Sequence, residues 1–201
     1  MEALKWFYIV TGKHEILSFG IFIIIVCGLG LRLIYILYTS IETRQQDVHS
    51  FGGVDGHAAY IEYIYNNMRL PDFNPKDRFQ FYHPPLHHII SAVFLKFIDF
   101  TGATWEKAKE SLQFLTLFYS GCHLIFTYRL FKEIKLKGIS LLVAILIIAV
   151  NPTMIILSGS INNDMLSICL MQCAIYYAVI WFKTPILSNI IKLAIFIGLG
   201  M

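Results

Sequence analysis

The sequence predicts an all-α, polytopic transmembrane helical bundle. Of its 201 residues, 57% are apolar and 14% are charged, whereas soluble domains average about 45–50% apolar and about 25% charged residues. A helix needs ~20 apolar residues to cross a bilayer core, and the expected spans cover residues 16–38, 111–131, 139–157, 165–182 and 186–201. We expect one transmembrane domain over residues 1–201. Because its last apolar run has no polar flank, we expect it to be the first part of a longer bundle.

The first expected span is followed by a long polar stretch, residues 40–110. Within it, apolar residues at helical spacing predict an amphipathic helix over residues 56–70 that lies in the membrane interface. Pro84 and Pro85 then predict the start of a second helix, over residues 84–100, since proline is well tolerated in the first turn.

That second helix is ambiguous, because its charged and imidazole side chains make it poor as a membrane span. Loops rich in Lys and Arg stay on the cytoplasmic side. The basic clusters are Lys5 and Lys13 at the N-terminus, Arg129, Lys132, Lys135 and Lys137 after the second span, and Lys183 and Lys192 around the last loop. All three fall inside only if residues 84–100 stay on the outer surface. We therefore predict a cytoplasmic N-terminus, with residues 40–110 and the loop 158–164 outside.

Charge and cysteine usage exclude several other classes. The net charge of +3 comes without a basic block, which argues against a nucleic-acid partner. The four cysteines all lie in apolar runs, where small apolar side chains serve helix packing, so neither a metal centre nor a redox pair is predicted.

The candidate catalytic and binding acids lie in the two expected outer loops. Asp47 and Asp55 belong to the first loop and Asp164 to the second. Ionisable groups at membrane depth are functional candidates by default. Each also has a structural interpretation: Asp47 as a solvated loop acid, Asp55 as a turn or cap residue, and Asp164 as a residue that favours the start of the following helix, with Asn162 or Asn163 as its cap.

Histidines gather in the first loop and at the start of its second helix: His49, His57, His83, His87 and His88. His83 and His87 are four residues apart and so suit either a metal site or, as we prefer, hydrogen bonds to a substrate phosphate or sugar. Arg32, near the outer end of the first span, is expected either to reach the headgroups or to face the bundle and bind a lipid-linked phosphate.

The order of these features resembles the type C glycosyltransferases, membrane enzymes that use lipid-phosphate-linked sugars. The resemblance points to the protein O-mannosyltransferases, the lipid A aminoarabinose transferases and bacterial mannosyltransferases of the dolichyl-phosphate-mannose type. The O-mannosyltransferases carry Asp-Glu-Val-His-Phe-Gly after the first span, to which Gln46–Gly52 is similar, with Asp47 in the second acidic place. Their Asp-Val-His-Pro-Pro-Leu-Gly-Lys stretch resembles Phe81–His88, which keeps His-Pro-Pro-Leu but lacks the acid and the lysine.

The aminoarabinose transferases suggest a different acid. Their Asp-Glu-Gly-x-Tyr-Ala-Glu motif loosely resembles Val54–Glu62, which places Asp55 in the catalytic position. We favour Asp47 and keep Asp55 as the alternative. The resemblance spans most of this chain but only the N-terminal half of a typical member, which has further spans and often a C-terminal extramembrane domain.

The resemblance implies a glycosyltransferase that moves a sugar from a polyprenyl-phosphate donor to a hydroxyl of a protein, lipid or glycan acceptor at the outer face. The aspartate would be the general base, with Arg32 or a histidine meeting the phosphate and Asp164 orienting the acceptor. No metal is assigned; a divalent ion, if used, would be Mg²⁺ or Mn²⁺. The alternative is a transporter or a non-catalytic membrane subunit that handles a lipid-linked substrate.

Overall fold

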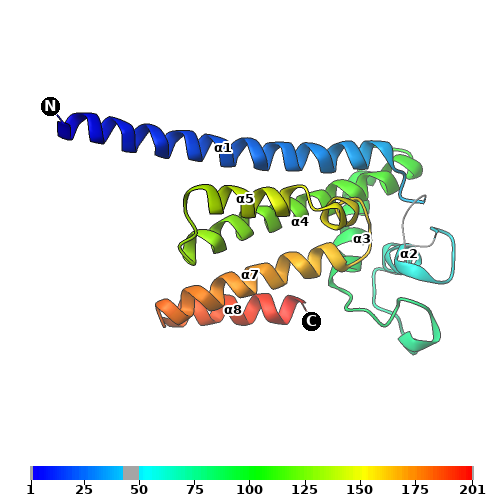
Figure 1. The fold of residues 1–201 in the computed structure, drawn as a ribbon. Helices are drawn as coiled ribbons and strands as arrows, with labels where there is room; N and C mark the ends of the chain where they lie inside the picture. The colour runs from blue at the N-terminus through cyan, green and yellow to red at the C-terminus, as the bar shows by residue number, and fades with distance from the viewer. Residues whose placement is uncertain (1, 43–49, 201) are drawn as a thin grey trace.

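The computed structural model describes residues 2–42 and 50–200, with side chains from residue 16 onward. The described secondary structure is entirely helical, which confirms the all-α prediction (Figure 1). The elements are α1 (Glu2–Tyr38), α2 (Gly56–Asn67), the short 3₁₀ helix η1 (Pro75–Asp77), α3 (Leu86–Asp99), α4 (Trp105–Glu133), α5 (Gly138–Ala149), α6 (Pro152–Leu157), α7 (Asp164–Lys183) and α8 (Leu187–Gly200).

Two of the described helices are long and apolar enough to cross a membrane. They are the Ile16–Tyr38 part of α1 and the whole of α7, and they match two of the expected spans. The expected span at residues 111–131 lies inside α4, which continues into charged residues at both ends. The described part of α8 is apolar and 14 residues long.

The residues of the expected span 139–157 form two helices instead of one. The 12-residue α5 ends at Ala149, and a separate helix, α6, begins at Pro152. Proline lacks an N–H and disfavours helical geometry in the preceding residue, so Asn151 adopts a non-helical backbone. Its side chain accepts a hydrogen bond from the backbone N–H of Met154 and so caps the new helix.

The two helices expected in the polar stretch are present, with slightly different ends. The first, α2, stops where Met68 adopts left-handed geometry (φ 52°), ahead of Pro71. The second, α3, starts at Leu86, after both prolines. The helices pack against each other, and α3 also packs against α4, so each buries one face in protein.

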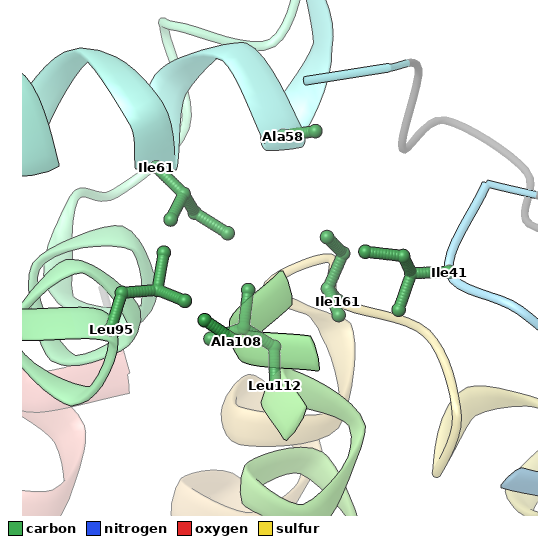
Figure 2. Packing of buried hydrophobic residues seen from close by; sticks show 7 residues of the cluster. All are labelled: Ile41, Ala58, Ile61, Leu95, Ala108, Leu112 and Ile161. Atoms are coloured by element: carbon green, nitrogen blue, oxygen red, sulfur yellow. The ribbon is translucent and has the colours of Figure 1, made fainter. Parts of the chain in front are cut away.

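The long helices run alongside one another, with α1 packed on α5 and α4, and α7 packed on α4 and α8. In Figure 1, α2 and α3 lie at the end of the bundle away from the N-terminus of α1. A buried apolar cluster joins this end to the bundle (Figure 2). It consists of Ile41, Ala58, Ile61, Leu95, Ala108, Leu112 and Ile161.

Candidate functional site at the junction of two polar loops

The two polar loops meet at the start of α3. His87 Nε2 lies 2.7 Å from the carbonyl oxygen of Ile161, in the loop between α6 and α7. A second hydrogen bond, 2.8 Å from Thr116 Oγ1 to the carbonyl of Ser158, fastens the same loop to α4. We call this meeting place, formed by the start of α3 and residues 158–164, the junction site.

Three histidines from the first loop lie close together beside the junction site. His57, in the first turn of α2, places its Nδ1 2.9 Å from Nε2 of His88, and the two rings are parallel within 10°. The His83 ring lies 5.1 Å from that of His57, and His83 is half-buried whereas His57 and His88 are buried. Tyr60 stacks on the other side of His88, with ring centroids 4.2 Å apart. One imidazole must donate and the other accept between His57 and His88, so this pair cannot be doubly protonated without losing its hydrogen bond.

His87 is a neutral imidazole of defined tautomer. Its Nε2 faces a carbonyl, which can only accept, so Nε2 carries the proton. Burial lowers the pKa of His87 to about 4, although the hydrogen bond to Ile161 acts in the opposite direction. Burial and the neighbouring imidazoles of His87 and His57 also lower the pKa of His88 well below its ordinary value. Both rings are therefore uncharged at neutral pH.

Two buried acceptors line a small hollow at the junction site. His87 Nδ1 and Asn163 Oδ1 are buried and have no hydrogen-bond partner in the protein. Both residues line a hollow closed by Pro84, Leu166 and Ser167, among others. The hollow measures about 10 Å³, the room needed for about one water molecule, and the two hydrogens of a water suit the two acceptors.

Asp55 and Asp164 have structural roles in this arrangement. Asp55 Oδ1 accepts a 2.8 Å hydrogen bond from the backbone N–H of Phe79, while Gly56 N–H donates to the carbonyl of Phe79. Asp55 thus fastens the loop before α3 to the start of α2. Asp164 is exposed and accepts a 2.9 Å hydrogen bond from Asn162 Nδ2. It occupies the first turn of α7, as its structural interpretation predicted.

Two of the predicted site residues, Asp47 and His49, lie outside the described residues. Of the others, the structure brings His57, His83, His87 and Asn163 together at or beside the junction site.

Arg32 lies apart from the junction site. Its side chain is fully buried (0% exposed), so the expectation that it reaches the headgroups was wrong. It faces the bundle, but it donates to protein acceptors: Nε to Ser120 Oγ at 2.7 Å, and Nη1 to the carbonyl oxygens of Gly28 (2.8 Å) and Ala149 (2.6 Å). The guanidinium thereby holds α1, α4 and the C-terminal end of α5 together, where a cation is favoured by the helix dipole. These contacts do not support the expected contact with a substrate phosphate.

A row of buried polar residues on α4 was missed by the sequence reasoning. Its members are Gln113, Thr116, Ser120, His123 and Thr127. Their spacing alternates between three and four residues, which places them on one helix face, and this regularity was the available signal. We call this row the polar stripe of α4. Ser120 of this stripe accepts a hydrogen bond from Arg32, and Gln113 Nε2 donates to the carbonyl of Thr39, directly after α1, at 2.9 Å.

Among the described residues, His83 and His87 do not belong to a group of three metal-binding side chains. Nε2 of His87 is directed at the Ile161 carbonyl. No group of three metal-binding side chains was found within residues 2–42 and 50–200.

Comparison with known proteins gives no relative. No family model, no curated protein and no solved structure matches this chain.

Proposed function

We propose that this chain forms the N-terminal part of a membrane glycosyltransferase that moves a sugar from a polyprenyl-phosphate donor to an acceptor hydroxyl. The observation that supports the proposal is the junction site. The His-Pro-Pro-Leu motif of the resemblance and the loop that contains Asn163 and Asp164 both lie in described residues, and the His87–Ile161 hydrogen bond joins them across the sequence. Placement of this site on the extracytoplasmic face, with a cytoplasmic N-terminus, is part of the proposal and rests on the basic clusters.

In the proposed reaction, the acceptor hydroxyl loses its proton to an aspartate while its oxygen bonds to the anomeric carbon. The bond between that carbon and the phosphate oxygen breaks, and polyprenyl phosphate leaves with the electron pair. The aspartate acts as general base. Neutral hydrogen-bonding groups such as His87 and Asn163 are suited to orienting the uncharged sugar or the acceptor.

Asp47 is the preferred base in this proposal, and Asp55 is the alternative. One carboxylate oxygen of Asp55 accepts a hydrogen bond from the Phe79 N–H. This gives Asp55 a structural role that a general base does not require. Arg32 is assigned no role in binding phosphate, because its hydrogen bonds go to Ser120 and backbone carbonyls.

The experiment is a transfer assay with the full-length protein in lipid nanodiscs and a panel of polyprenyl-phosphate sugars, with release of polyprenyl phosphate as the readout. Asp47→Asn should abolish release, whereas Asp55→Asn, which keeps an oxygen acceptor for Phe79, should retain most of it. Equal membrane insertion of both variants is the control. Full activity of Asp47→Asn would remove that residue as the base, and no release from any donor would reject the transferase.

A transporter of a lipid-linked substrate is the second candidate, favoured by one specific feature. Helices broken at membrane depth and buried polar groups in apolar helices are typical of transport proteins, and this chain has the break between α5 and α6 together with the polar stripe of α4. Reconstitution into liposomes separates the two functions. A transporter would move the intact lipid-linked sugar between leaflets, and a transferase would cleave it.

A further inference from the structure

A groove runs between α1 and α4, and Arg32 is not among its lining residues. One part of it is a hollow of about 380 Å³ lined only by apolar residues and glycine. The lining residues are Leu29, Gly30 and Leu33 of α1 and Leu117, Phe118, Gly121, Cys122 and Ile125 of α4.

The groove continues into a second hollow of about 350 Å³ at the end near α2 and α3. Its lining includes Leu37 of α1, Ser40 of the turn that follows α1, and Glu110, Gln113 and Phe114 of α4. On α4 the lining positions of the two hollows follow one another at helical spacing, so both hollows border the same face of that helix. From residue 110 to residue 125 of α4 the groove is roughly 22 Å long.

The polar end of the groove offers hydrogen-bond acceptors. Ser40 donates its hydroxyl to Glu110 Oε1 at 2.6 Å. Thr39 donates to the carbonyl of Tyr35 at 2.7 Å, and Gln113 Nε2 donates to the carbonyl of Thr39 and to Glu110 Oε2. Glu110 is the one charged residue in the lining of this hollow. A phosphate headgroup would meet a carboxylate with like charge here, whereas a hydroxyl would find acceptors.

We propose that this groove binds a lipid alcohol, with its hydrocarbon chain between α1 and α4 and its terminal hydroxyl at Glu110. The inference rests on the proposed function and names the acceptor class for it: the sugar would be transferred to a membrane lipid that ends in a hydroxyl. The groove lies along the Ile16–Tyr38 segment of α1, which is apolar enough to cross a membrane, so a chain bound there is at membrane depth.

The chain itself offers a pair of variants for blocking the groove. A side chain at Gly30 would meet nothing within 4 Å, and the residue lines the apolar hollow, so Gly30→Leu should fill the groove without displacing α1. Gly198 in α8 has equally open space but lies outside the groove. Gly198→Leu is therefore the matched control for added bulk and changed helix propensity.

The test is photocross-linking of the full chain in nanodiscs with a diazirine-bearing hexadecanol, compared with the phosphate and the amine of the same chain. The alcohol should label peptides of α1 and α4 at least about tenfold more efficiently than the phosphate, since tenfold corresponds to a difference in binding of about 1.4 kcal/mol. Gly30→Leu should abolish the labelling, and Gly198→Leu should leave it unchanged. Glu110→Gln should lower the ratio of labelling by the alcohol to labelling by the phosphate, because the substitution removes the negative charge.

Three results would overturn the proposal: equal labelling by the alcohol and the phosphate, stronger labelling by the amine, or labelling that survives Gly30→Leu. Because the readout is binding, it is independent of sugar transfer. Alcohol labelling without sugar transfer would leave the lipid site standing and reject the transferase. Sugar transfer to a soluble acceptor without alcohol labelling would support the transferase and reject the lipid site.

Discussion

The imidazole Nε2 of His87 and the carbonyl oxygen of Ile161 lie 2.7 Å apart, although the residues are 74 positions apart in the chain. This hydrogen bond joins the start of α3 to the loop before α7. Ile161 is fully buried in the apolar cluster that connects α2 and α3 to the bundle (Figure 2). If this hydrogen bond is lost, the buried carbonyl of Ile161 is left with neither a protein donor nor water.

Replacement of His87 should destabilise the fold more than replacement of a neighbouring histidine. His87→Ala removes the donor to Ile161 and opens a cavity, at an expected cost of about 2–3 kcal/mol. His83→Ala, at a half-buried position, should cost less than about 1 kcal/mol. Urea unfolding in detergent micelles, followed by circular dichroism, measures both. Equal losses would show that the His87 bond adds nothing specific.

Stability should decrease as the pH falls from about 6.5 towards 4. Burial lowers the pKa of His87 to about 4 in the folded protein, whereas an unfolded histidine titrates near about 6.5. Above that range neither state holds the proton, and His87 contributes no pH dependence. Between the two values only the unfolded state binds the proton, so the free energy of unfolding drops by roughly 3 kcal/mol in all, and His88 acts in the same direction.

Unfolding curves at several pH values test this decrease, with His87→Gln as the comparison. The variant should lose a large part of the slope between pH ~6.5 and ~4, because glutamine does not titrate there. An unchanged slope would mean that other groups cause the pH dependence.

Lysine should not replace Arg32. The guanidinium donates at once to Ser120, Gly28 and Ala149 in three helices, and an ammonium group cannot reproduce that planar fork. Arg32→Lys should cost about 2–4 kcal/mol of unfolding free energy. Arg129→Lys, at an exposed position of α4, should change it by about 0.5 kcal/mol or less. The free energies of unfolding of both variants are measured in the same detergent. An unchanged free energy for Arg32→Lys would contradict the role of Arg32 in holding the three helices together.

Two glycines of α1 should respond oppositely to alanine. A Cβ atom at Gly28 would lie 2.8 Å from Cβ of Ala149, so Gly28→Ala should force α1 and α5 apart and cost about 1–3 kcal/mol. Gly30 has nothing within 4 Å, so Gly30→Ala should be neutral or gain up to about 1 kcal/mol from helix propensity. Thermal unfolding of the two variants measures the difference, and a tolerated Gly28→Ala would show that the helix contact is looser than its geometry indicates.

The parts predicted well from sequence are those set by local pattern. Helical spacing of apolar residues located α2, the paired prolines preceded α3, and the apolar run from residue 165 located α7. The break between α5 and α6 also had a local signal, Asn151 followed by Pro152, which the length of the apolar run concealed. The position of these helices relative to a membrane stays a prediction from the basic clusters.

The sequence by itself determined the all-helical class, the approximate helix ends and the gathering of histidines and acids in two polar loops, because these follow from spacing and composition. Only the tertiary structure decided which of those groups meet. Arg32 donates to a carbonyl 117 positions away. The carbonyl of Ile161 fixes which ring nitrogen of His87 carries the proton. Such partners depend on which helix faces pack together, and no short-range pattern encodes that choice.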